Sequence, residues 1–251
     1  MLSATALGGL PEVTAGQDLA QLIVHALSAD RQELRPDDVL VVAHKVVSKS
    51  EGRTRSLADV NPGAEAIALA GRLDKDARLV QAILEESRRV VRAERGVLIC
   101  ETRHGFVCAN AGVDASNVPG HDSVVLLPKD PDGSARGLRR RLLELTQTAP
   151  AIIITDTFGR AWRVGQAEVA IGCAGLDPLE DWRGRADSVG RELKATWIAV
   201  ADELASAADL ARTKDGSQPV VLVRGAGRHV TAADGPGAAA LRRPPAEDLF
   251  R

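Results

Sequence analysis

Hydrophobic positions follow two different periods along the chain, and the two periods separate predicted helices from predicted strands. In residues 15–27, AGQDLAQLIVHAL, apolar side chains recur every three or four positions, so they line one face of a helix. Residues 39–43 (VLVVA), 151–155 (AIIIT) and 219–225 (PVVLVRG) are short apolar runs rich in β-branched residues. Such runs predict buried strands.

The rest of the pattern predicts further helices, a hairpin and an extended tail. Helical spacing is found in residues 63–71, 76–93, 135–147 and about 189–212. Strand patterns are found in residues 96–100 and 105–109, predicted as a hairpin, and in residues 123–128. We expect the tail to be extended, because Pro244 and Pro245 forbid a continuous helix. Helices and strands mix without strict alternation, so the expected fold class is a mixed-sheet α/β or α+β protein.

Composition narrows the possible functions. The 251 residues are 45% hydrophobic and 26% charged, which is typical of a globular protein with a large core. Aromatic residues make up only 2% and tyrosine is absent, so stacking platforms for nucleic acid are not expected. A net charge of −2 attracts neither nucleic acid nor an anionic membrane, and any anion site must be local.

Location and redox state follow from the same sequence. No apolar run reaches membrane-spanning length and the first residues lack a basic leader, so we expect a cytoplasmic protein. Cys100, Cys108 and Cys173 are odd in number and lack metal-ligand spacing. We therefore expect reduced thiols in the core.

Two polar segments follow predicted strands. AHKVVSKSEGR, residues 43–53, brings Lys45, Lys49 and Arg53 to a strand end, where α/β proteins often bind phosphate. The alternative is a solvated helical face. No Walker A motif is present, so a P-loop NTPase is not indicated.

Oxygen-bearing side chains are concentrated after two other predicted strands. The loop CANAGVDASNVPG, residues 108–120, contains Asp114 and Asn117, and AIIITDTFGRAWRVG carries Asp156 and Thr157. Oxygen ligands suit Mg²⁺ or Mn²⁺, and nearby arginines such as Arg160 suit phosphate or carboxylate. The alternatives are Asx-turn structure in the first loop and an arginine–aspartate ion pair in the second segment.

Two more segments are compatible with an anionic ligand. LPEV, residues 10–13, precedes a predicted helix, and exposed amides of such a loop can bind a nucleotide. KDPDGSARGLRRRL, residues 129–142, combines a helix start with a run of arginines. A plain loop and a solvated basic face are the respective alternatives.

Seven collinear blocks carry a resemblance to a known family. They are LPEV, AHKVVSKSEGR, RLVQAILEESRRVVR, GFVCANAGVDASNV, LLPKDPDGSARGLR, TDTFGRAWRVGQAEVAIG and VADELASAADL. Together they resemble the coenzyme F420-0:L-glutamate ligase family, also called F420 gamma-glutamyl ligases. The chain also resembles the N-terminal ligase half of the actinobacterial two-domain enzyme. We therefore expect residues 1–251 to form a ligase domain without the nitroreductase-like domain.

The resemblance implies a fold and a reaction. The family has a two-lobed mixed α/β fold that forms an intertwined homodimer. Its enzymes ligate L-glutamate to coenzyme F420-0 with GTP, through an acyl phosphate, and extend a gamma-linked glutamate tail. They use two divalent cations, Mg²⁺ or Mn²⁺, and K⁺ stimulates them. Another metal-dependent phosphotransferase, or a non-catalytic nucleotide- or F420-binding module, is the alternative.

The resemblance also implies roles for individual residues. Carried over by motif, the GTP-binding residues are Leu10, Pro11, Glu12, Val13, His44, Lys49 and Asn117. The implied metal ligands are Asp114, Asp156 and Thr157, and the catalytic residues are Asp156 and Arg160. Residues 211–219 align with a nucleotide loop in which Asp215 stands for an acidic metal ligand.

Overall fold

The computed structural model describes residues 1–115, 122–213 and 215–248. A five-stranded sheet has the order β1-β12-β2-β8-β9. Its strands are β1 (Ser3–Ala6), β2 (Val39–Ala43), β8 (Ala151–Arg160), β9 (Arg163–Ala174) and β12 (Val220–Arg224). Strands β2 and β8 are parallel, and the other neighbours are antiparallel, so the predicted mixed-sheet α/β class is confirmed.

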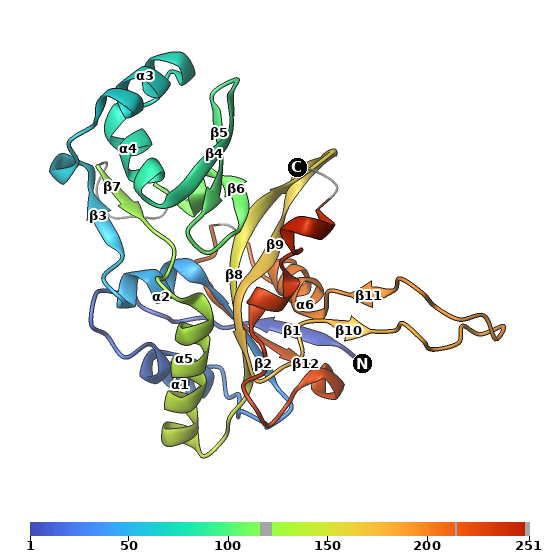
Figure 1. The fold of residues 1–251 in the computed structure, drawn as a ribbon. Helices are drawn as coiled ribbons and strands as arrows, with labels where there is room; N and C mark the ends of the chain where they lie inside the picture. Colours follow the sequence, from blue (N-terminus) through green and yellow to red (C-terminus); the bar gives the residue numbers. More distant parts are fainter. Residues whose placement is uncertain (116–121, 214, 249–251) are drawn as a thin grey trace.

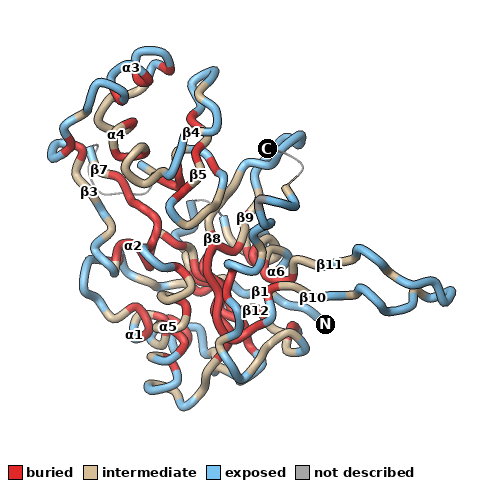
Figure 2. The backbone as a smooth tube through the Cα atoms, viewed as in Figure 1, coloured by how far each residue is buried: buried red, intermediate tan, exposed pale blue. Residues whose placement is uncertain are grey.

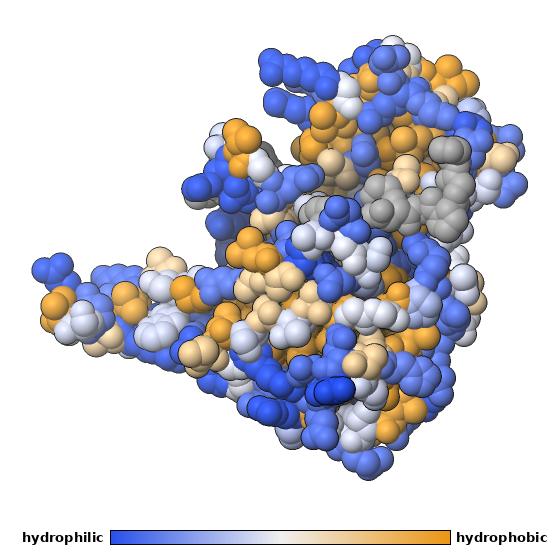
Figure 3. Space-filling view, turned by 180° about the vertical axis from the view of Figure 1, so that it is seen from behind, coloured by the Kyte–Doolittle hydropathy of each residue, from blue (hydrophilic) through white to orange (hydrophobic). Residues whose placement is uncertain are grey.

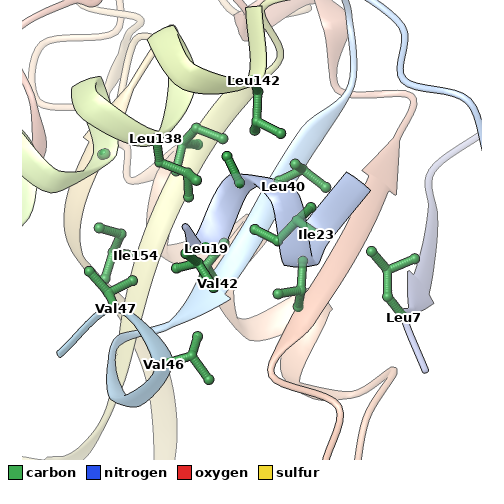
Figure 4. Packing of buried hydrophobic residues seen from close by; sticks show 14 of the residues in the cluster. Leu7, Leu19, Ile23, Leu40, Val42, Val46, Val47, Leu138, Leu142 and Ile154 are labelled. Atoms are coloured by element: carbon green, nitrogen blue, oxygen red, sulfur yellow. The ribbon is translucent and has the colours of Figure 1, made fainter. Parts of the chain in front are cut away.

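Helices cover both faces of this sheet (Figure 1). They are α1 (Leu19–Ala29), α2 (His44–Ser50) and α5 (Pro131–Thr146) on one face and α6 (Val200–Asp209) on the other. Successive residues of a strand point to opposite faces. Leu40 and Val42 of β2 accordingly pack under α1, as Figure 4 shows, while Val39 and Val41 pack under α6.

A smaller lobe has its own core and stands above the sheet (Figure 1). It contains a three-stranded sheet of β4 (Ser87–Glu94), β5 (Val97–Thr102) and β6 (Val107–Ala109), with α3 (Ala64–Leu73) and α4 (Ala77–Glu85). A two-stranded sheet of β3 (Thr54–Ser56) and β7 (Ser123–Val125) joins it to the lobe that contains the five-stranded sheet. Figure 2 shows buried backbone in both lobes.

The remaining elements are short. They are the strands β10 (Glu180–Asp181) and β11 (Trp197–Ile198) and the 3-10 turns η1 (Leu57–Asp59), η2 (Asn110–Gly112), η3 (Gly227–His229), η4 (Ala238–Leu241) and η5 (Pro245–Glu247). Residues 180–198, here called the arm, project from the body (Figures 1 and 3). In the part of the chain that the structure describes, no helix is long and apolar enough to cross a membrane.

Several predicted boundaries are wrong. The helix predicted over 76–93 ends at Glu85, and residues 87–94 form strand β4. The helix predicted over 189–212 is limited to residues 200–209, because the preceding residues belong to the arm. The strand predicted to end at Thr155 continues to Arg160 through antiparallel pairing with β9, which the sequence pattern did not predict.

Candidate active site

The end of the parallel strand pair places Asp156 beside His44. The pairing of β2 with β8 ends at Ala43 and Thr155. His44 and Asp156 are the residues that directly follow this last pair. The Nε2 atom of His44 lies 3.3 Å from Oδ1 of Asp156. The histidine side chain is 2% exposed and the aspartate 14%. Asp156 therefore stands at the carboxyl edge of the parallel pair, although its strand continues.

Among the described residues, one nitrogen of the His44 imidazole has no hydrogen bond. Its Nδ1 atom is 3.4 Å from the Ser48 hydroxyl, one helical turn away. Its Nε2 atom is buried, and its approach to Asp156 does not have hydrogen-bond geometry. A buried ring nitrogen without a partner is costly, and it points to a group that is not part of this chain.

Asp114 meets the next residue of the same helix. The Nζ atom of Lys45 lies 2.7 Å from Oδ2 of Asp114. Asp114 is held in place by two backbone hydrogen bonds with Val125 of β7. The first turn of α2 thus contacts both predicted metal-binding carboxylates through consecutive side chains, and it brings them from separate lobes to one region.

Thr157 points to the opposite face of β8. Its hydroxyl donates to Oε1 of Glu168 at 2.7 Å, on the face covered by α6. Glu168 is 4% exposed, and its Oε2 atom lies 3.2 Å from the Arg212 guanidinium. The structure therefore does not place the Thr157 hydroxyl with the Asp156 carboxylate, although the Thr157 amide donates to Oδ1 of Asp156 at 2.8 Å.

Sequence reasoning missed Glu168 and Arg212. The available signal was a carboxylate inside an otherwise apolar strand pattern, AEVAIG, since a buried charge needs a partner.

The predicted nucleotide segment lies against α2. Lys49 is buried, and its Nζ atom lies 2.5 Å from Oε1 of the exposed Glu12. Val13 is buried in the core and Leu10 packs against it, which leaves Pro11 and Glu12 facing solvent. The structure thus places LPEV beside the lysine of AHKVVSKSEGR, and the GTP-binding role of both stays a prediction. Lys49 is not part of a solvated face.

Three predicted residues lie elsewhere. Arg160 is at the exposed turn of the β8–β9 hairpin, where it donates to the Val164 carbonyl at 2.8 Å. It is four positions further along the strand than Asp156, or about 13 Å, so its catalytic role stays a prediction. Asp215 is exposed, and a hydrogen bond from Thr213 lowers its pKa. Asn117 lies outside the described residues.

The arginines of α5 differ in their surroundings, since one is buried and others lie at the surface. Arg139 is buried and binds Asp234 and the carbonyls of Pro150, Thr231 and Ala232, so it anchors the C-terminal segment. Arg136 and Arg140 line a depression of about 380 Å³ on the outer face of the helix. No predicted catalytic or metal-binding residue lines this depression, so we place the candidate site at α2 on chemical grounds.

The carboxylates of Asp114 and Asp156 fit a divalent cation that is shared with a substrate. Among the described residues, no group of three or more His, Cys, Asp and Glu side chains surrounds one metal position. Mg²⁺ commonly takes only one or two carboxylates when phosphates complete its shell. Asp114 faces the Lys45 ammonium and Asp156 faces the His44 imidazole, so a cation bound by either carboxylate would have to displace the group that now lies beside it.

The cysteines are buried and form no disulfide, as predicted. Burial raises the pKa of Cys108 to about 12, and the nearby Asp156 carboxylate contributes to this shift. Burial also raises the pKa of Cys173 to about 12. Both thiols therefore stay protonated, and Cys108 places β6 close to the candidate site.

Comparison with known proteins gives a consistent result. The family model described as F420-0:Gamma-glutamyl ligase matches residues 9–225. The chain is 45% identical over 252 residues to the coenzyme F420:L-glutamate ligase of Methanothermobacter thermautotrophicus, covering 100% of this chain and 99% of the relative. It is 46% identical over 258 residues to the protein of that name from Methanopyrus kandleri, covering 98% and 100%. The Archaeoglobus fulgidus protein of the same name is 47% identical over 218 residues, covering 86% and 85%.

The fold is that of a two-lobed mixed α/β protein. Its candidate site consists of charged side chains at the end of the parallel strands β2 and β8, next to the smaller lobe. Within that class, the chain belongs to the F420-0:gamma-glutamyl ligase family.

Proposed function

We propose that this chain ligates L-glutamate to coenzyme F420-0 with GTP, and that it can extend a gamma-linked glutamate tail. The observation that carries the proposal is that Asp156 and Asp114 contact consecutive residues of α2, His44 and Lys45, in a chain of this family. The relatives named as coenzyme F420:L-glutamate ligases support the reaction class.

The proposed chemistry has two balanced steps. A carboxylate oxygen of F420-0 attacks the γ-phosphorus of GTP, and GDP leaves with the electrons of the broken P–O bond. The amine of glutamate then attacks the acyl carbon, phosphate leaves, and the nitrogen loses a proton as the amide forms. Both steps bring anions together, so the site must offset negative charge.

The chain's own residues supply that offset in part. Residues 10–13 and Lys49 are assigned to GTP, since the ammonium of Lys49 sits beside the exposed LPEV loop. Asn117 stays assigned to GTP, and His44 is the neighbour of Asp156 on the same side. Lys45 adds a positive charge next to Asp114.

Divalent cations complete the proposed site. Asp114 and Asp156 would hold Mg²⁺ or Mn²⁺, with Thr157 proposed at a second ion. When bound, these cations neutralise phosphate charge and polarise the oxygens of the transferring group. K⁺ is part of the proposal through the resemblance alone, and no described residue is assigned to it.

We also propose that the chain forms a homodimer through the arm. A two-stranded ribbon is marginally stable in water. Here Arg183 lies 4.1 Å above the Trp197 ring and Arg185 lies 4.8 Å above the Trp182 ring, which stiffens the ribbon. Val189 is 74% exposed at its outer part, and such a projecting apolar residue suits contact with a second copy.

Mass spectrometry tests the reaction directly. The protein is incubated with F420-0, L-glutamate, Mn²⁺ and either GTP or ATP. We expect products heavier by whole glutamyl residues in the GTP sample only. GTP turnover that ignores F420-0 and glutamate would instead favour another phosphotransferase. No turnover by folded, metal-loaded protein would favour a binding module.

A further inference from the structure

A second depression, of about 160 Å³, lies where the two lobes and the C-terminal segment meet. Its wall contains His104 and Phe106 from the β5–β6 turn, Lys129 from the segment before α5, and Arg242 after η4. Ile171 of β9 contributes to its wall. None of these residues belongs to the nucleotide and metal site described above, so the depression needs its own explanation.

One phenylalanine, Phe106, lines this depression, and a second, Phe158, packs against it. The chain has only three phenylalanines and no tyrosine. The ring centre of Phe106 lies 6.1 Å from that of Phe158, in an edge-to-face arrangement, and 6.1 Å from that of His104. Phe106, supported by Phe158, therefore gives the depression an aromatic wall of the kind that stacks against an aromatic ligand.

The same depression carries positive charge. Lys129 is exposed and has no ion-pair partner among the described residues, and the Arg242 guanidinium lies 6.0 Å from the Phe106 ring centre. Two aspartates also line it, but Asp130 caps α5 through the Gly133 amide. Asp132 accepts hydrogen bonds from backbone amides, including that of Cys173. The two carboxylates are therefore occupied. Arg242 donates to the His104 and Ala239 carbonyls and still brings its positive charge to the wall, and the Lys129 ammonium faces solvent.

His104 adds an unused acceptor to the wall. Its Nε2 atom lies 3.1 Å from the Lys129 carbonyl, which can only accept, so Nε2 carries the proton. In that tautomer Nδ1 is an acceptor, and it is buried without a hydrogen-bond partner among the described residues. A ring N–H of a ligand would satisfy it.

The depression lies next to the candidate active site. Asp156 and Phe158 are two residues apart on β8, so they share a face and are separated by about 7 Å along the strand. Phe106 contacts Phe158, while Cys108, two residues further along the chain from Phe106, lies near enough to Asp156 to feel its charge. An aromatic group stacked on Phe106 would thus be separated from Asp156 by the side chain of Phe158 alone.

We propose that this depression binds an aromatic ring system carrying an anionic group, and that its occupant is the acceptor of the proposed ligation. F420-0 has these properties, since it is a deazaflavin with a carboxylate-bearing chain. Phe106 would stack on its ring, and Lys129 and Arg242 would bind its anionic chain. The volume matches the about 150 Å³ that one aromatic ring occupies in a cavity, so the rest of the ring system extends into solvent.

The identity of this ligand rests on the proposed function, and a binding experiment separates the two. Equilibrium dialysis measures the Kd for F420-0 and, separately, the Kd for GTP. The proteins are the wild type, Lys129→Glu, Phe106→Leu, and Lys75→Glu as a control in the smaller lobe. Lys129 is exposed, and leucine keeps most of the buried volume of Phe106, so both variants should fold.

We expect the Kd for F420-0 to rise about tenfold in Lys129→Glu and about threefold to tenfold in Phe106→Leu, as the loss of a charge contact and of ring stacking predicts. The Kd for GTP should stay within about twofold, and Lys75→Glu should match the wild type. Unchanged F420-0 binding in both variants, with normal wild-type binding, overturns this inference alone. Weakened GTP binding would assign the depression to the nucleotide. A wild type that does not bind F420-0 overturns the proposed function as well.

Discussion

Asp156 combines a position fixed by the backbone with a side chain that the core does not need. The register of β2 with β8 places it beside His44, and its Oδ1 atom accepts a hydrogen bond from the Thr157 amide that an asparagine oxygen can also accept. The buried Nε2 of His44 beside it lacks a hydrogen bond among the described residues. We therefore predict that Asp156 serves a ligand and contributes little to stability.

Replacing Asp156 with asparagine should therefore remove activity and preserve the fold. We expect the Asp156→Asn variant to lose about 100-fold or more of its glutamyl ligation rate, because one charged group at a reaction centre commonly contributes that much. Its thermal unfolding midpoint should stay close to that of the wild type. Asp59→Asn, at an exposed aspartate in η1, is the matched control. Ligation at the wild-type rate in Asp156→Asn would remove this residue from the site.

Asp202 shows the opposite behaviour, because its burial affects stability and not chemistry. Burial raises the pKa of this carboxyl above its ordinary value of 3.8, although the Ala170 amide donates to it at 2.9 Å. The unfolded chain then loses the proton at lower pH than the folded protein does. Stability from this group is therefore complete below the ordinary pKa and falls as pH rises from about 4 to the raised pKa.

The Asp202→Asn variant should not show this loss of stability with rising pH. Asparagine keeps the acceptor for the Ala170 amide but cannot ionise. We expect the free energy of unfolding of the variant, relative to the wild type, to increase between about pH 4 and about pH 7. Urea unfolding of both proteins across this range measures the difference. A difference that does not change with pH would show that Asp202 ionises normally in the folded protein.

At the scale of elements, β8, β9 and α6 are joined by a buried polar network. Glu168 of β9 accepts from Thr157 of β8, lies beside Arg212 after α6, and accepts from the Ser206 hydroxyl through its backbone carbonyl. The two charged side chains are both almost fully buried. Removing one partner of such a pair leaves the other charge without compensation.

Glu168→Gln should consequently destabilise the protein by about 3 kcal/mol, the lower end of the effect expected for breaking a buried ion pair. Urea unfolding at pH 7 measures the change. Glu144→Gln is the control, since Glu144 pairs with Arg141 at 2.8 Å on the exposed face of α5 and should leave the unfolding midpoint unchanged. Equal effects of the two substitutions would mean that the Glu168 network is not a buried ion pair.

The sequence predicts elements well where one period dominates. The apolar runs at 39–43 and 219–225 became central strands, since both of their faces are covered. Residues 87–94 were predicted wrongly, because Ile83 and Val90 are seven positions apart, a spacing that lies on one face of a helix and so extended the predicted helix past residue 83. Tertiary pairing with β5 decided between them, and it cannot be read from local spacing.

The candidate site is predicted in chemistry but not in geometry. Glu12 of LPEV contacts Lys49, and Asp114 and Asp156 contact consecutive residues of α2, while the roles assigned to these residues stay predictions. The Thr157 hydroxyl points toward Glu168 because side chains alternate between the two faces of β8. The sequence did not predict this orientation, because the strand was expected to end before Asp156. Arg160 was expected near the carboxylates because a turn was assumed where a strand continues.

On the scale of the whole molecule, the two lobes meet at the candidate site while the arm points away from both (Figures 1 and 3). The arm buries little of its own surface, and Val189 and Trp197 are exposed on it. A ribbon of this kind gains stability only by packing against another surface. Because a second copy supplies the same surface in reverse, a symmetric pair could bury both arms at once.

Size-exclusion chromatography with light scattering tests the proposed dimer. The wild type should have twice the chain mass of 26.5 kDa. Val189→Asp should shift the mass toward a single chain, because a carboxylate buried between two subunits costs more than the contact it replaces. Ile67→Asp, which changes an exposed apolar residue of α3 in the smaller lobe, should leave the dimer intact. A dimeric Val189→Asp protein would move the interface away from the arm, and a monomeric wild type would exclude the proposed homodimer.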